Sequence, residues 1–226
     1  MRFAELVGRL SPKAQSYTLG SGGIPSITTQ DIAGALALAE QQTGRNATQI
    51  FLMRANPAMV DLDYESLLRA ELAKEYARQR EPVIDCDLRA EMCGLYGDID
   101  GAMKAASDRK KLAANLWPSG SNSDRYSCLI ASVVHEFVSP GLCMVCNGRA
   151  EFREESLSVD CKACNKTGKA HMNDDVRAQN MGIGASPFYR TWKAPYKWLL
   201  DYMEDNFMTV NRVGSRALWG DQDADA

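Results

Sequence analysis

The sequence lacks the features that direct a chain into or across a membrane. No apolar run in its 226 residues approaches the roughly 20 residues that a membrane helix requires. The first residues, MRFAELVGRLSPK, alternate charged and apolar side chains without the apolar core of a signal peptide. We therefore expect a cytoplasmic protein with no membrane partner.

Charge of one sign is also scarce, because the formal net charge is only −3. A nearly neutral chain does not bind polyanions in general, so any contact with nucleic acid must come from a local basic surface. Hydrophobic residues make up 45% and charged residues 24% of the chain. These values are ordinary for a globular protein and exclude a wholly disordered one.

Residues for acid–base catalysis and phosphate binding are few, with two histidines in all. His135-Glu136 is followed by Ser139 where a zinc protease motif needs a second histidine. The glycine-rich segment 20–23 lacks the preceding strand and the Lys-Ser/Thr ending of a phosphate-binding loop. We expect neither an enzyme nor a small-molecule substrate.

What the sequence does contain is a doubled C-x-x-C pattern, CMVC and CKAC, separated by residues 147–160. Cysteines stay reduced in the cytoplasm, so this spacing indicates metal or redox chemistry before disulfides. Redox C-x-x-C motifs normally occur singly at the start of a helix. The pattern predicts one structural zinc ion, held on a short hairpin by four thiolates that leave no position for substrate: Cys143, Cys146, Cys161 and Cys164. The other cysteines, Cys86, Cys93 and Cys128, are expected to be small core residues.

Helical periodicity dominates the rest of the chain and predicts a mainly α fold. A helix over 31–42 is expected to be capped by Thr28 or Thr29 and ended by Gly44, and a helix over 63–80 to end at Glu81-Pro82. Further helices are expected over 88–96, 99–116, 126–138, 174–181 and 187–207. The expected organisation is a flexible arm (1–29), a helical body (30–138), a zinc hairpin (139–171), a helix-turn-helix-like DNA-binding segment (172–213) and an acidic tail (214–226).

The segment after the cysteines has the layout of a helix-turn-helix. Ala178 suits the helix crossing, Gly182 the turn and Ile183 the entry to the second helix. Ser186 is expected to cap that helix, and Pro195 to kink or end it after about two turns. An ordinary helical hairpin with a basic face is the alternative.

The second helix predicts a DNA-contacting surface. Phe188 and Trp192 should face inward, and between Ser186 and Lys197 there are three basic residues and no acidic one. A helix that enters the major groove beside phosphates has this character. The predicted DNA contacts are Ser186, Tyr189, Arg190, Lys193 and Lys197.

Together these segments resemble the late-gene antitermination Q proteins of lambda-like phages. The resemblance rests on the N-terminal MR-x-x-x-x-V-x-x-x-SPK, the segment DIAGAL at 31–36, the SPG turn before CMVCNGRA, and CKACNKTGKA. The cysteine segments are similar to the C-x-x-C-x-G-x-G repeats that DnaJ-type chaperones also carry. Ala150 and Lys166 stand where this repeat has glycine.

The resemblance implies a transcription antitermination factor with two partners. Such proteins bind double-stranded DNA near a late promoter, load onto bacterial RNA polymerase paused there with its sigma factor, and block terminator hairpins at the RNA exit channel. DNA contact would then fall to residues 186–197, and Arg2, Arg9 and Lys13 would contact the polymerase or the RNA channel. The alternative function is a DnaJ-like cochaperone or protein-binding zinc adaptor, which normally carries a His-Pro-Asp tripeptide or further C-x-x-C repeats.

Overall fold

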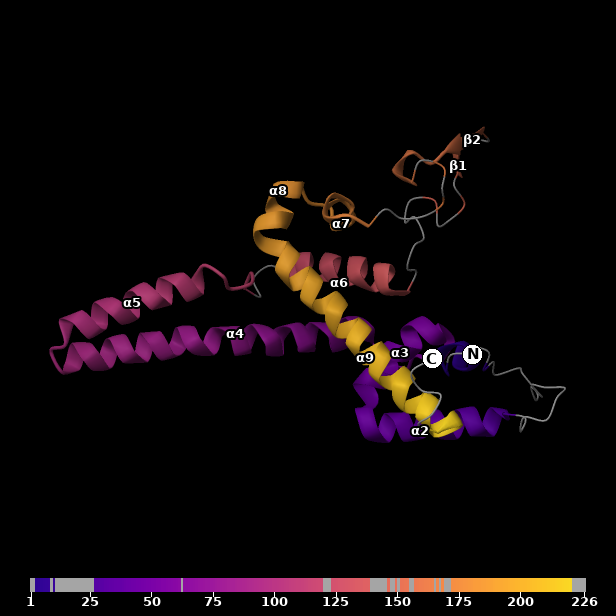
Figure 1. The fold of residues 1–226 in the computed structure, drawn as a ribbon. Helices are drawn as coiled ribbons and strands as arrows, with labels where there is room; N and C mark the ends of the chain where they lie inside the picture. The colour runs from indigo at the N-terminus through magenta and orange to yellow at the C-terminus, as the bar shows by residue number, and fades with distance from the viewer. Residues whose placement is uncertain are drawn as a thin grey trace. The chain divides into compact units, whose positions relative to one another are not determined.

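The computed structural model of the chain is mainly helical (Figure 1). It describes residues 3–8, 10, 27–61, 63–119, 123–138, 146, 149, 151–154, 157–164, 166, 168 and 172–220. Among the helices in these ranges, none is both long enough and apolar enough to cross a membrane. The elements, in chain order, are α1 (Phe3–Gly8), α2 (Thr29–Thr43), α3 (Arg45–Ala55), η1 (Pro57–Met59), α4 (Tyr64–Leu95), α5 (Ile99–Ala113), α6 (Ser123–Val138), β1 (Glu151–Glu154), β2 (Leu157–Asp160), η3 (Lys162–Cys164), α7 (Asp174–Asn180), α8 (Ala185–Pro187), η4 (Phe188–Trp192) and α9 (Lys193–Trp219).

The chain divides into two compact units that are interleaved in sequence. The first unit comprises Met1–Tyr64, Val133–Met172 and Trp198–Ala226, and the second comprises Glu65–Ser132 and Asn173–Lys197. Helices α6 and α9 each contribute residues to both units. The units therefore do not follow the linear order of domains expected from the sequence.

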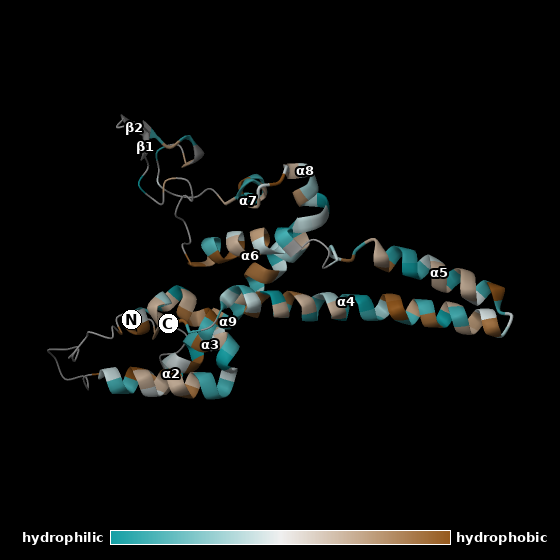
Figure 2. Cartoon of the chain, turned by 180° about the vertical axis from the view of Figure 1, so that it is seen from behind, coloured by the Kyte–Doolittle hydropathy of each residue, from teal (hydrophilic) through white to brown (hydrophobic). Residues whose placement is uncertain are grey.

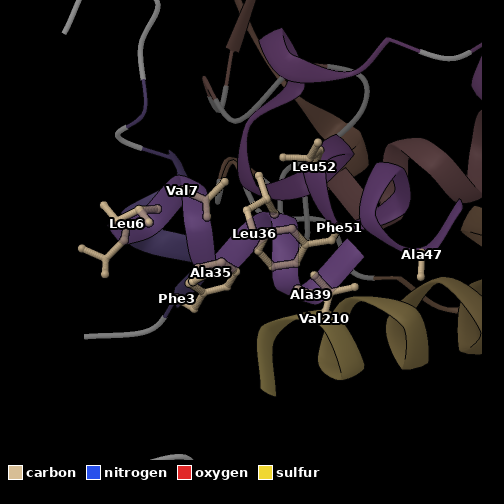
Figure 3. Close-up of a cluster of buried hydrophobic side chains, with 11 residues drawn as sticks. Phe3, Leu6, Val7, Ala35, Leu36, Ala39, Ala47, Phe51, Leu52 and Val210 are labelled. Carbon is tan, nitrogen blue, oxygen red and sulfur yellow. The ribbon is translucent and has the colours of Figure 1, made fainter. Parts of the chain in front are cut away.

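The core of the first unit is formed by α1, α2, α3 and the C-terminal half of α9 (Figure 3). Phe3, Leu6 and Val7 of α1 are fully buried in it, so the expected flexible arm over 1–29 is wrong for its first residues. Their i, i+3, i+4 spacing places three apolar side chains on one face of a short helix. The amide nitrogen of Ala4 donates to Asn211 Oδ1 at 3.1 Å, which ties α1 to α9.

Helix α2 begins and ends where the sequence predicts. Thr28 Oγ1 accepts from the amide of Asp31 at 3.2 Å, and Asp31 Oδ2 accepts from the amide of Thr28 at 2.7 Å, which completes a capping box. The Thr28 hydroxyl also donates to Asp31 Oδ2, and the hydrogen bonds from the amide and the hydroxyl of Thr28 lower the pKa of Asp31. Gly44 ends the helix with φ +90°, and α3, which the sequence did not predict, begins at the next residue.

Arg54 of α3 links this core to two aromatic rings. Its guanidinium lies 4.7 Å from the ring centroid of Phe207 and 5.4 Å from that of Phe137. Both oxygens of Glu204 accept from the same nitrogen of Arg54, at 2.9 and 3.0 Å. The cation thus has a carboxylate partner while its flat face covers apolar surface, an arrangement that suits arginine better than lysine.

The second unit contains a long antiparallel hairpin of α4 and α5, which run side by side in Figures 1 and 2. Pro82 lies inside α4, so the expected end of the helix at Glu81-Pro82 is wrong, and the helices expected over 63–80 and 88–96 are one. The buried stripe Leu68, Leu72, Glu75 resumes beyond the proline at Val83 and Cys86. Pro82 itself is exposed, so water can solvate the carbonyl that its missing N–H leaves unpaired.

Helix α9 continues to Trp219, inside the stretch 214–226 that we assigned to an acidic tail. The reason is that Val210 is buried and that Phe207, Leu218 and Trp219 pack on the core of the first unit at helical spacing. Residues 221–226 lie outside the described residues.

Candidate functional sites

Three of the four predicted zinc ligands come together in the first unit. The Sγ atoms of Cys146, Cys161 and Cys164 all lie within 4.8 Å of one another, and all three residues are buried. Sulfurs that are each about 2.3 Å from one tetrahedral zinc ion are about 3.8 Å apart. The Cys146–Cys164 separation of 3.7 Å meets this requirement, so the cluster could hold a metal ion. Cys143, the fourth predicted ligand, lies outside the described residues.

Short elements position these thiols. Strands β1 and β2 pair antiparallel, with Glu151 opposite Asp160 and Glu154 opposite Leu157, so the pairing brings Cys161 back toward the start of β1. Cys161 follows β2 directly, and Cys164 ends the 3-10 turn η3. A two-stranded antiparallel hairpin therefore lies between Cys146 and Cys161.

Backbone groups just after Cys164 fold back toward the cysteine cluster. Lys166 and Gly168 adopt positive φ angles of 62° and 67°. The amide of Lys166 donates to the carbonyl of Cys161 at 3.1 Å, and the amide of Gly168 donates to Cys164 Sγ at 3.3 Å. A donor aimed at the sulfur stabilises a thiolate more than a thiol. Lys166 thus occupies the backbone conformation for which the C-x-x-C-x-G-x-G repeat carries glycine.

The other cysteines do not join this cluster. Cys86 is buried, as expected for a core residue, and Cys93 is half-buried. Cys128 is exposed, so its assignment to the core is wrong: it lies on the face of α6 opposite the buried Leu129 and Ile130. His135 is half-buried on α6, and burial lowers its pKa. His171 lies outside the described residues.

In the second unit, α7 and α8 are joined by a tight glycine turn. The amide of Gly182 donates to the carbonyl of Gln179 at 2.9 Å, and the amide of Ile183 donates to that of Ala178 at 3.0 Å. With φ +65° at Gly182, this is a Schellman ending. Ala178 is 1% exposed, as a small residue at a helix crossing should be. Arg125 of α6, which sequence reasoning missed, donates to the carbonyl of Gly182 at 3.3 Å.

The following helix differs from the expected one in its N-cap residue and in its continuation past Pro195. Gly184, not Ser186, is the N-cap residue, and no side chain caps the helix; Ser186 lies inside α8. Pro195 does not end the helix, because α9 continues through it. The π-helical turn η4 just before Pro195 widens the backbone, and this relieves the clash between a proline ring and the carbonyl four residues earlier.

The faces of this helix are those expected. Phe188 and Trp192 are buried; Phe188 packs edge-on against Tyr196 with ring centroids 5.7 Å apart, and Trp192 packs edge-on against Tyr126 at 5.2 Å. Burial raises the pKa of Tyr126 to about 12, and its hydroxyl donates to the carbonyl of Pro118 at 2.7 Å. The predicted contact residues are all exposed: Ser186, Tyr189, Arg190, Lys193 and Lys197.

Lys193 has a protein partner that the sequence did not indicate. Its Nζ atom lies 2.6 Å from Asp174 Oδ2, while Arg177 donates to Asp174 Oδ1 at 3.2 Å. The hydrogen bond from Lys193, supported by that from Arg177, lowers the pKa of Asp174, and the pKa of Lys193 rises in return. Lys193 Nζ also lies 5.2 Å from the ring centroid of Tyr189. Asp174 therefore fixes Lys193 across the turn.

The predicted polymerase contacts Arg2, Arg9 and Lys13 lie outside the described residues. No protein-family model, curated protein or solved structure matches this chain.

Proposed function

We propose that Cys143, Cys146, Cys161 and Cys164 hold one structural zinc ion. The clustered, buried thiols of the last three residues carry this proposal, since their spacing suits a shared tetrahedral ion. Cys143 completes the C-x-x-C pair with Cys146 and is the natural fourth ligand. Four thiolates fill the shell, so the ion would hold the hairpin together and take no part in chemistry on a substrate.

Metal analysis of the purified protein tests this site. We expect about one zinc ion per chain, because four thiolates form one tetrahedral shell, and loss of zinc in Cys143→Ser and in Cys161→Ser. Cys128→Ser, at an exposed thiol on α6, is the matched control and should keep the metal. Iron in place of zinc would change the assigned ion, and metal retained in Cys143→Ser would remove that residue from the shell.

We also propose that α7 and the helix from Ala185 act as a helix-turn-helix that contacts double-stranded DNA. The buried Ala178, the Gly182 turn and the inward Phe188 and Trp192 support this, together with the exposed basic face. Arg190 and Lys197 are the side chains best placed to reach DNA, and Lys193 is held beside them by Asp174.

Alanine variants test the DNA contact by its dependence on sequence and salt. Arg190→Ala should weaken binding to the specific site by about 1–3 kcal/mol if Arg190 reads a base. If Lys193 and Lys197 contact phosphates, Lys193→Ala and Lys197→Ala should each weaken binding to all DNA sequences alike. Each should also lower the dependence of log affinity on log salt concentration by about 1 in slope. Lys74→Ala on α4 is the control with unchanged affinity. Wild-type affinity in all three variants would exclude this helix from the interface.

The function that these two sites support best is transcription antitermination. In this proposal the protein binds DNA near a late promoter, loads onto bacterial RNA polymerase with its sigma factor in the host cytoplasm, and lets it read through terminators. The sequence resemblance supports it, as does the combination of a local basic helix with a net charge of −3, which suits loading at one site better than coating nucleic acid. Arg2, Arg9 and Lys13 are the proposed polymerase contacts.

Transcription with purified polymerase through a terminator tests this function. Read-through should require the protein and the promoter-proximal element, and Arg190→Ala should reduce it. Equal read-through on templates without that element would contradict site-specific loading. No read-through, together with binding of unfolded polypeptides, would favour the zinc adaptor instead.

A further inference from the structure

The far part of the α4–α5 hairpin exposes large apolar side chains. Around the tip, Leu95 is 81%, Tyr96 80%, Ile99 73% and Met103 68% exposed. Along α4, Ile84, Leu88 and Met92 are also exposed and, with Leu95, recur at helical spacing on one stripe. Figure 2 shows hydrophobic residues along both helices of the hairpin. Scattered apolar side chains on a surface are ordinary, but a continuous patch of this kind marks an interaction site.

The hairpin has little core of its own. Beyond Pro82, α4 buries Val83 and Cys86, and α5 buries Ala105. A groove of about 360 Å³ runs between the helices, lined by Leu88, Met92 and Cys93 from α4 and by Gly101, Lys104 and Ala105 from α5. Because helices gain most of their stability from a packed apolar face, this pair is suited to receive further helices.

The charges on the two helices indicate what those further helices are. Residues 81–95 of α4 carry four acidic side chains and one basic one, whereas α5 carries four basic and two acidic ones. A two-fold interface brings the same surface of both copies together, so it must be complementary to itself. A hairpin with one acidic and one basic helix meets this condition when α4 of each copy faces α5 of the other.

We propose that the α4–α5 hairpin is a homodimerisation element that pairs with the same hairpin of a second copy to form a four-helix bundle. The exposed stripe of Leu88, Met92 and Leu95, together with Ile99 and Met103, becomes the shared core. The acidic and basic helices select the pairing and its orientation. This interface shares no residue with the cysteine cluster or with the α7–α9 segment, and it does not depend on the function proposed for them.

Analytical ultracentrifugation of the full chain first tests whether the apolar stripe forms the dimer interface. The wild type should sediment as a dimer, with twice the 24.9 kDa mass of one chain. The double variant Leu95→Glu/Met103→Glu should sediment as a monomer, and circular dichroism should show that its helix content is unchanged. Both side chains are exposed in the single chain, so their replacement should not disturb folding. Met208→Glu, at another exposed methionine, on α9, is the matched control and should remain a dimer.

A charge exchange then identifies the partner as a second copy. Asp85→Lys/Glu91→Lys makes α4 basic, and Lys104→Glu/Lys110→Glu makes α5 acidic, all at exposed positions. Each variant alone should be monomeric, while an equimolar mixture should form a heterodimer, because both cross-pairings again oppose unlike charges. A monomeric wild type at about 100 µM, well above the Kd of an ordinary specific contact, would overturn the proposal. So would a Leu95→Glu/Met103→Glu variant that remains a dimer.

Discussion

At the scale of single residues, Lys166 is the non-glycine residue with positive φ within the described ranges. An L residue in this conformation is strained by about 1–2 kcal/mol, whereas glycine is not. The Lys166 ammonium pairs with Asp160 at 2.5 Å, but both side chains are more than half exposed, and such pairs contribute little. The strain therefore outweighs the ion pair.

We predict that Lys166→Gly stabilises the cysteine hairpin by about 1 kcal/mol relative to Lys166→Ala, because only the alanine keeps the strain. Both variants lose the pair with Asp160, so comparing them isolates the backbone effect. Urea unfolding of the metal-loaded protein, followed by metal release, measures the difference. Equal stability of the glycine and alanine variants would contradict it.

A second residue-scale prediction concerns pH. The pKa of Asp174 is lowered in the folded chain by the hydrogen bonds from Lys193 and Arg177. A carboxyl with a depressed folded pKa stabilises the fold above its unfolded pKa, about 4, and loses that contribution as pH falls through its folded value. The melting temperature of Asp174→Asn should therefore lie below that of the wild type at pH 7, and the gap should close below about pH 4. Asp175→Asn, at the exposed neighbouring carboxylate, is the control; a gap in Asp174→Asn that does not vary with pH would refute the assignment.

The sequence predicted local features well at this scale and tertiary pairs poorly. The positions of Ala178 and Gly182 could be predicted from the residue types alone, since a helix crossing needs a small side chain and a left-handed turn favours glycine. The pair between Asp174 and Lys193 has no such signal, because the two residues come together only through the turn between their helices. The cysteine cluster lies between these cases: its spacing predicted four ligands, and the described residues bring three of those four thiols together.

At the scale of elements, Pro82 is the clearest conflict between local preference and packing. Its position inside α4 leaves one carbonyl without an intrahelical donor. We predict that Pro82→Ala stabilises the protein by about 1–3 kcal/mol, because alanine restores the hydrogen bond and removes the ring clash. Urea unfolding followed by circular dichroism measures this, with the exposed neighbour Glu81→Ala as the control. A destabilised Pro82→Ala would mean that the hairpin needs a bend at this point.

Glycines in two helices provide a matched pair of element-scale predictions. A Cβ atom at Gly214 of α9 would collide with the ring of Phe3, whereas one at Gly34 of α2 would meet nothing within 4 Å. Gly214→Ala should therefore destabilise the first unit by about 1–3 kcal/mol through overpacking, while Gly34→Ala should stabilise it by up to about 1 kcal/mol through helix propensity. Thermal unfolding compares the two, and a stable Gly214→Ala would show that α1 does not pack closely on α9.

The elements that sequence reasoning missed were missed for physical reasons. In α3, residues Ala47 to Met53 are all buried, so the helix shows no amphipathic stripe from which to recognise it. A proline normally ends a helix, but α4 continues through Pro82 and buries Val83 and Cys86 beyond it, so packing overrides that preference. By contrast, α2 could be predicted because a capping residue, an apolar stripe and a terminal glycine all indicate the same helix.

At the scale of the whole molecule, the buried thiols and the apolar core of the first unit are separate clusters with no residue in common. Removal of the proposed zinc ion should therefore unfold residues 146–168 while leaving α1, α2 and α3 folded. Hydrogen exchange before and after treatment with a chelator measures this, and we expect amide protection to fall in the hairpin and to persist in α3. Loss of protection in both regions would show that the metal supports the whole first unit.

The docking of α1 on α9 joins residues 207 positions apart in the chain, Ala4 and Asn211. Translation therefore delivers Phe3, Leu6 and Val7 long before the surface that buries them exists. The aromatic stack of Phe3 on Phe51 can form early, with ring centroids 5.6 Å apart, but the side of Phe3 that meets Gly214 stays open until α9 is made. The first unit can close only after α9 has been synthesised, so a nascent chain arrested within α9 still exposes apolar side chains of α1.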